Sequence, residues 1–161
     1  SLWSQISAEA VTGPSLGRRL ALLRSRVERL GEWKRSHPET TVLSRETGYR
    51  RDYARSPYAG YADSPRLAFP VKFDRRYHPK MPTLGLRIEG GKARAYPALE
   101  VVRAGGVVEE RFDGRPIRVA FDSEGQVFRV VAPESVEVVQ GYWFAWAAFH
   151  PDTSVFVSSD P

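Results

Sequence analysis

Tyrosine and arginine alternate within one short segment of the sequence, and this pairing can do binding chemistry. The residues are Tyr49, Arg50, Arg51, Tyr53, Arg55, Tyr58 and Tyr61. Such a segment can stack nucleobases while its arginines hold phosphates. It can equally form a protein-binding surface, because Tyr and Arg are enriched at interface hot spots. A third interpretation is a loop that wraps its own domain, with the tyrosines buried and the arginines paired to Asp52 and Asp63.

Three histidines, His37, His78 and His150, are the weak candidates for metal ligands or proton carriers. His37 and His150 occupy equivalent positions in a repeated pattern, so pseudo-symmetry could bring them together. The competing interpretation is that each caps the C-terminal end of a helix, where free carbonyls attract a histidine. Isolated histidines without patterned acids are a weak metal signal. The sequence therefore predicts neither a metal site nor a cofactor.

Two further patterns resemble catalytic motifs only in form. Residues 13–17 match G-x-S-x-G, but that motif needs a buried strand before it and a helix after it. Polar residues precede this segment, so we interpret it as a turn. Glu109 and Glu110 are neighbours in a predicted strand and would point to opposite faces, so we expect both at the surface. These patterns favour a non-catalytic protein over an enzyme.

Composition narrows the class of protein further. The 161 residues are 42% hydrophobic and 27% charged, as in one globular domain, and none is cysteine. A disulfide scaffold, a thiolate zinc site and a cysteine nucleophile are thereby excluded. No apolar run is long enough to predict a transmembrane segment. The net charge of +5 favours anionic partners, but the basic residues form no tract, so nucleic acid is not an expected partner.

The first half of the chain gives few regular elements. Short apolar runs predict strands over residues 19–24 and 41–44, and the spacing of Val27, Leu30 and Trp33 predicts a helix over 27–37. Residues 45–82 are rich in proline and tyrosine and show no sustained period. A segment with this aromatic content usually packs onto something. We therefore expect a long ordered loop that lies on the domain.

The second half predicts a β-meander with α+β character. A helix is expected over residues 97–103, after a proline start, and a buried helix over 142–150. Turn signals at Glu89-Gly90-Gly91-Lys92 and Asp113-Gly114 indicate hairpins. The predicted fold is β-rich and mostly antiparallel, with two or three short helices and a barrel as one arrangement of the sheet. Strands are expected over residues 84–88, 93–96, 107–112, 117–121, 127–131, 136–139 and 155–157.

One pattern occurs twice and predicts an internal duplication. WKRSHPETTVL, from Trp33, stands against WAAFHPDTSVF, from Trp146, at an offset of 113 residues (146 − 33). In each copy we expect the tryptophan to anchor a helix to a sheet and His-Pro to end that helix. The division predicted is a first-copy tail over 1–44, the loop over 45–82 and a second copy over 83–161, within one compact domain.

Short stretches spread along the chain carry a family resemblance. They are LWSQ from Leu2, GP with GRRL from Gly13, EWK with HP from Glu32, TGYRRDY from Thr47, PY with GY from Pro57, AYP from Ala95 and WFAWAAFHPDT from Trp143. With these stretches the sequence resembles the C-terminal part of the DUF3179 family of uncharacterised bacterial and archaeal proteins. The resemblance covers essentially the whole chain, and the tyrosine-rich loop and the last motif are specific to it. It implies that family members are usually longer at the N-terminus, commonly carry a Cys-Pro-x-Cys-like motif there, and often reach the cell envelope.

Two functions are carried forward. The first is a non-catalytic module of the cell envelope or periplasm, or a secreted one, which binds a partner protein or a small ligand through the Tyr/Arg loop. Such a module could be an accessory subunit of a larger complex. The second is part of a redox or metal-dependent enzyme whose site is completed by an N-terminal half that this chain lacks, with the three histidines as its only obvious contribution.

Overall fold

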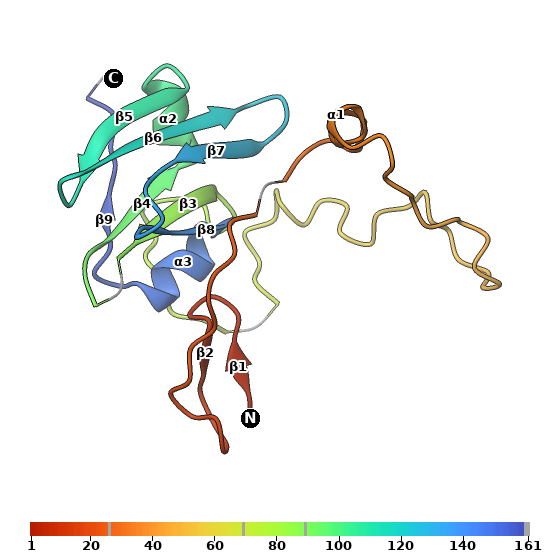
Figure 1. The fold of residues 1–161 in the computed structure, drawn as a ribbon, viewed down its shortest axis with the longest axis horizontal. Helices are drawn as coiled ribbons and strands as arrows, with labels where there is room; N and C mark the ends of the chain where they lie inside the picture. Colours follow the sequence, from red (N-terminus) through yellow and green to blue (C-terminus); the bar gives the residue numbers. More distant parts are fainter. Residues whose placement is uncertain (26, 69, 89, 160–161) are drawn as a thin grey trace.

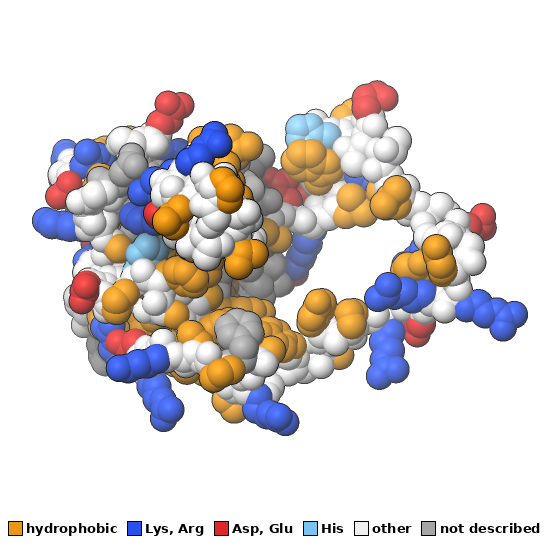
Figure 2. Space-filling model, turned by 90° about the horizontal axis from the view of Figure 1, so that it is seen from below, with side chains coloured by type: hydrophobic (Ala, Val, Ile, Leu, Met, Phe, Trp, Pro, Cys, Tyr) orange, Lys and Arg blue, Asp and Glu red, His pale blue; other side chains and the backbone are white. Residues whose placement is uncertain are grey.

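A β-rich body and a long arm make up this chain in the computed structural model, which describes residues 1–25, 27–68, 70–88 and 90–159 (Figure 1). The arm, residues 27–60, leaves the body and returns to it, and it contains helix α1 (Leu30–Ser36). In the space-filling view it stands away from the body with an opening between them (Figure 2). The regular elements therefore concentrate in the body, and the arm carries most of the residues singled out for binding.

Two sheets form the centre of the body. The larger has the order β8-β3-β4-β9 and the smaller the order β5-β6-β7. All pairs are antiparallel except β4 with β9, which run parallel. The bounds are β3 (Pro82–Arg87), β4 (Ala93–Pro97), β5 (Val107–Phe112), β6 (Arg115–Asp122), β7 (Val127–Val131), β8 (Glu137–Tyr142) and β9 (Ser154–Val155).

The main core lies between these two sheets and helix α2 (Ala98–Arg103). Leu84 and Leu86 project into it from β3, and Val119 and Phe121 meet them from β6. This follows from the strand period, because alternate residues of a strand face the same side. The predicted meander is confirmed here, and its Asp-Gly turn is built as expected. Asp113 has φ 49° and Gly114 φ 78°, the positive values that a tight two-residue hairpin turn requires.

The opposite face of the larger sheet is covered by helix α3 (Trp143–Phe149). Trp143 and Trp146 are buried there against Ala95 of β4. Gly85 of β3 lies directly under the Trp146 ring, and a Cβ built on it would lie 2.2 Å from two ring carbons. The absence of a side chain at this position lets the helix lie close to the sheet. Strand β3 is therefore covered on both faces, and its four central residues are all buried.

Several predictions from the sequence need correction. The larger sheet is open, and no closed barrel is found in the described part of the chain. The strands predicted over 19–24 and 41–44 are wrong, because neither run forms a strand; Arg19 forms an isolated β-bridge to Glu9. Leu23 and Leu43 in these runs are exposed, because no partner strand lies beside them. Glu89 of one predicted turn lies outside the described residues.

The N-terminal hairpin was not predicted. Strands β1 (Trp3–Ser4) and β2 (Glu9–Ala10) pair antiparallel over two residues each. Ala10 is fully buried, and its backbone N–H donates to the Arg18 carbonyl over 2.9 Å. Strands this short carry too few residues for a period to emerge in the sequence. None of the helices in the residues described is long and apolar enough to cross a membrane.

Gly85 gives a direct test of the packing. Gly85→Ala is expected to lower the free energy of unfolding by about 3 kcal/mol, because the new methyl group overlaps the Trp146 ring. Gly141→Ala in β8 is the matched control, since nothing lies within 4 Å of the added Cβ. Urea unfolding of both variants measures the difference. Equal stability of the two variants would contradict this account of the α3 contact.

Candidate functional site

The Tyr/Arg segment runs along the arm and reaches the body at Tyr61, and none of its residues belongs to either apolar core. Tyr49 is 81% exposed and Tyr58 73% exposed. Tyr53 has a hydrogen-bond partner within the loop, because its hydroxyl lies 2.6 Å from Oγ1 of Thr47. Residues 45–60, the first part of the 45–82 loop that we expected to lie on the domain, are all exposed. The tyrosines present aromatic surface to solvent instead of covering the body.

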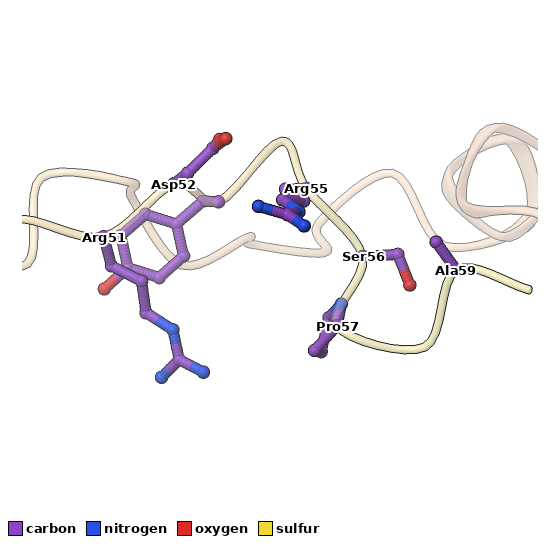
Figure 3. A pocket seen from close by; sticks show the side chains of 7 residues that line it. Arg51, Asp52, Arg55, Ser56, Pro57 and Ala59 are labelled. Carbon is purple, nitrogen blue, oxygen red and sulfur yellow. The ribbon is translucent and has the colours of Figure 1, made fainter. Parts of the chain in front are cut away.

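Local turns shape this segment. The backbone N–H of Ala54 donates to Oδ1 of Asp52 over 3.0 Å, and that of Tyr58 donates to Oγ of Ser56 over 3.2 Å. Short polar side chains that bond the backbone two residues on are typical of turns. The bend leaves a hollow of about 560 Å³, lined by Arg51, Asp52, Tyr53, Arg55, Ser56, Pro57 and Ala59 (Figure 3).

The arginines of the segment are not held in ion pairs by acidic side chains of the described residues. Figure 3 shows Arg51 and Asp52 pointing to opposite sides of the chain. Within the described residues, no ion pair joins Arg51 or Arg55 to a carboxylate, which contradicts the proposed pairing of the arginines with Asp52 and Asp63. The guanidinium groups of this loop are thus oriented towards solvent, where an external acceptor can reach them.

Tyr61 differs from the other tyrosines because it anchors the loop. The Nζ of Lys80 lies 3.6 Å from the centre of its ring, a cation–π contact. The same ammonium donates to the carbonyls of Tyr61, Ser64 and Arg66 over 2.6, 2.7 and 2.8 Å. Lys80 is only 3% exposed, so three carbonyls and one ring replace its water. This lysine fixes the point where the arm returns to the body, and sequence reasoning did not single it out.

Later residues of the 45–82 loop contact the body. Phe73 and Tyr77 lie against the tryptophans of α3. The Nε1 of Trp143 donates to the Asp74 carbonyl over 2.6 Å. The Tyr77 hydroxyl donates to Oε1 of Glu100 over 3.3 Å, and burial together with that carboxylate raises the pKa of Tyr77 to about 12. Contacts of the loop with α2 and α3 are therefore made by its later part, from Phe73 onward.

The structure does not gather the three histidines into a site. His37 follows α1 in the arm, and His150 follows α3 in the body (Figure 1). Nδ1 of His78 accepts the backbone N–H of Lys80 over 3.3 Å. Among the described residues, no three His, Asp or Glu side chains lie together as metal ligands.

His37 and His150 instead belong to two units with the same local structure. His37 N–H donates to the Trp33 carbonyl over 2.8 Å, and His150 N–H to the Trp146 carbonyl over 2.9 Å. The Trp33 Nε1 donates to Oγ1 of Thr40 over 2.8 Å, and the Trp146 Nε1 to Oγ1 of Thr153 over 3.0 Å. Each histidine ring also lies on its tryptophan, with centroids 3.8 and 4.0 Å apart.

Two carboxylates are more enclosed than the sequence suggested. Glu110 was expected at the surface, but it is half-buried; its Oε1 accepts the Tyr96 hydroxyl over 2.5 Å and faces Nε of Arg94 at 2.6 Å. Burial and this carboxylate raise the pKa of Tyr96. Glu100 is buried in α2, and its Oε2 accepts the Ser158 N–H over 3.0 Å. Both carboxylates are fully bonded and tie strands and termini together, a structural role.

A groove of about 580 Å³ lies beside β7 and β8, with Phe128 and Val138 among its apolar lining. Three arginines border it, but each already has a partner. Arg24 donates to backbone carbonyls that include that of Ala132, over 2.7 Å. Arg118 pairs with Glu109 at 3.0 Å, and Arg129 with Glu32 at 3.8 Å. The groove is consequently weaker as a binding site than the solvent-directed arginines of the arm.

The comparison with known families identifies the chain. Residues 1–136 match the family described as "Protein of unknown function (DUF3179)". The chain belongs to the DUF3179 family. The matched residues of this DUF3179 chain include the arm, α1 and the Tyr/Arg segment. No curated protein and no solved structure shows significant similarity to it. The family description names no reaction.

His150 makes stability depend on pH. Burial, reinforced by the cation of Arg87 and opposed by Glu137, holds the pKa of His150 below its ordinary 6.5. The unfolded chain therefore binds this proton more readily, and stability is lost as pH falls from 6.5 towards the lower folded pKa. His150→Phe keeps a ring on Trp146 and is expected to remove this part of the slope in thermal unfolding. His37→Phe, at the exposed equivalent position, should retain it; equal slopes in both variants would contradict the assignment.

Lys80 predicts a second measurable effect. Lys80→Met removes the donor of three carbonyls, so residues 61–66 should detach and trypsin should cut after Arg66 several-fold faster. Lys72→Met is the control, because Lys72 is exposed. The rate of appearance of the Arg66 fragment, followed by mass spectrometry, measures the effect. An unchanged rate in Lys80→Met would show that other contacts hold this part of the loop.

Proposed function

We propose that this DUF3179 protein is a non-catalytic interaction module of the cell envelope, which binds a partner protein through the Tyr49–Tyr61 loop. The observation that carries the proposal is the exposure of Tyr49 and Tyr58 on an arm that stands off the body (Figure 2). Neither apolar cluster in the described residues draws a side chain from before Phe73. The arm contributes nothing to these cores, so its aromatic surface is available for another molecule.

The chemistry of the loop supports a protein as the ligand. Tyrosine supplies a large contact area with only two side-chain torsions to fix, so little conformational entropy is lost on binding. Arginine adds a planar donor that pairs with carboxylates and main-chain carbonyls. Arg51, Arg55 and Tyr58 present both properties within one turn-rich segment. A module with such an arm is suited to act as an accessory subunit of a larger complex.

The alternatives have less support. A small ligand would need an enclosed pocket, whereas the hollow of the loop is lined by the loop alone. For a redox or metal-dependent enzyme, the described residues offer no cluster of ligands, and His37 lies on the arm away from His150. No specific observation favours that second function. The envelope location rests on the resemblance of family members described above.

A double substitution tests the proposal. Tyr49→Ala with Tyr58→Ala is expected to weaken partner binding at least tenfold, because a hot-spot tyrosine contributes about 2 kcal/mol or more. Both side chains are largely exposed, so thermal stability should not change. The tagged natural protein and the variant are purified from the source cells by size exclusion, and the co-eluting chains are quantified by mass spectrometry.

The control is Leu99→Ala with Val102→Ala, which removes exposed apolar surface from α2 on the body. This control should keep the same co-eluting chains as the natural protein. If the tyrosine variant also keeps them in full, the loop is not the binding surface. If natural protein and variant both elute as a lone monomer, the subunit proposal fails.

A further inference from the structure

We infer that the partner of the Tyr49–Tyr61 loop presents an acidic protein surface, whose carboxylates pair with the arginines of this loop. The inference rests on the proposed function, because it names the chemistry of the partner at the same surface. It adds a separate requirement, since exposed tyrosines by themselves can bind an uncharged surface. The partner can therefore prove real without being acidic.

Positive charge is concentrated in one segment of the chain. Residues 45–76 contain eight Lys or Arg and four Asp or Glu, so they carry +4 of the net charge of +5. The rest of the chain has 16 basic (24 − 8) and 15 acidic (19 − 4) side chains and is almost neutral. Lys and Arg side chains project into solvent from the outer part of the arm (Figure 2). The excess of positive charge therefore belongs to the arm and to the chain that returns from it.

Nearly all basic side chains of this segment lack a partner in the described part of the chain. One of the eight, Arg76, pairs with Asp74 at 2.7 Å. The other seven form no ion pair and donate no side-chain hydrogen bond within the described residues; they are Arg45, Arg50, Arg51, Arg55, Arg66, Lys72 and Arg75. Their charges are thus balanced only by solvent and dissolved ions.

Basic side chains elsewhere in the chain behave differently. Arg94, for example, pairs with Glu110 at 2.6 Å. Outside residues 45–76, Arg18 and Lys34 are the only described basic side chains that form neither an ion pair nor a side-chain hydrogen bond. The body therefore pairs its own cations, whereas the cations of the 45–76 segment remain available to an acceptor on another molecule.

The type and order of these side chains indicate which anion they fit. Six of the seven are arginines, and a guanidinium matches the two oxygens of a carboxylate with two parallel hydrogen bonds. Tyr49, Tyr53 and Tyr58 alternate with them, so aromatic area separates the charges. Complementary charges across an interface accelerate encounter and select the partner. The alternation fits a protein surface on which acidic and apolar side chains stand side by side.

Other anionic partners fit this segment less well. A single-stranded nucleic acid is held by a positively charged groove that follows its phosphates, whereas Glu46 and Asp52 lie among these arginines. A membrane surface is bound by apolar side chains that enter the lipid together with the basic ones. Residues 44–66 contain no Leu, Ile, Val, Met, Phe or Trp. An acidic protein surface is therefore the occupant that the charge and the side chains favour.

A zero-length crosslinker tests the contact directly. Arg51→Lys with Arg55→Lys keeps the charge and supplies primary amines, and a carbodiimide joins such an amine to a carboxylate in contact with it, with loss of water. The tagged variant is expressed in its source cells, and mass spectrometry identifies the crosslinked peptides. The expected product is an amide between position 51 or 55 and an Asp or Glu side chain of one partner segment. Arg18→Lys is the control, because the amines at positions 18 and 34 should not reach that segment.

Binding to the purified partner then measures the contribution of the charges. Arg51→Gln with Arg55→Gln lowers the net charge from +5 to +3 and is expected to raise Kd at least tenfold in low salt. Arg18→Gln with Lys34→Gln makes the same change of charge at the other free cations and should leave Kd within twofold. In about 0.5 M NaCl the difference between the natural protein and the Arg51/Arg55 variant should shrink to about threefold or less, because salt screens exposed charges.

The outcomes distinguish this inference from the proposed function. If Tyr49→Ala with Tyr58→Ala releases the partner but Arg51→Gln with Arg55→Gln leaves Kd within twofold, the loop is the binding surface and the acidic partner is wrong. If both variants keep the partner in full, both proposals fail. The inference is also overturned if the amines at positions 51 and 55 reach no Asp or Glu of another protein, whether nothing is bound or the natural protein instead sediments with vesicles of anionic phosphatidylglycerol.

Discussion

The contact between Gly85 and Trp146 sets the geometry of the body. Strand β3 is central in the larger sheet and has apolar neighbours on both faces, so one face must accept a helix at very short range. A tryptophan ring over a bare backbone achieves this, because no Cβ intervenes. With the helix this close, β9 can reach the edge of β4. The last strand is placed by the helix before it.

The unit around α1, residues 30–43, shows which part of this arrangement is local. Its tryptophan, histidine and threonine make the same bonds without any sheet beside them. The short-range sequence is thus enough to specify the turn after the helix, since a proline stops the helix and a threonine bonds the indole. It does not specify where the unit lies, because exposed ion pairs cannot fix a helix against a body. The local residues therefore determine the conformation of the turn after the helix, whereas packing on the sheet determines where the helix lies.

The same distinction explains how far the sequence could predict this structure. The strands over 84–131 were predictable, because their signals are short-range. Apolar and polar residues alternate along each strand, and the Asp113-Gly114 turn joins two neighbouring strands. The apolar runs over 19–24 and 41–44 looked like strands but lack partners, and a strand exists only with a neighbour to bond. In the candidate site, the composition of the Tyr/Arg segment was visible, but its exposure was not. Lys80 and Glu100 escaped notice because most of their hydrogen-bond partners are distant in the sequence: three carbonyls for Lys80, and the Tyr77 hydroxyl and the Ser158 N–H for Glu100.

The arm has an unfavourable balance between the conformational entropy that its ordering costs and the surface that it buries. Ordering a residue on folding costs about 1–2 kcal/mol of backbone entropy, which burial normally offsets. Residues 27–60 bury almost nothing in the body, yet they carry the exposed faces of Trp33, Tyr49 and Tyr58. Covering those rings with another surface would remove apolar area from water and so offset part of that entropy. This balance supports the proposal that the Tyr49–Tyr61 loop is a contact surface.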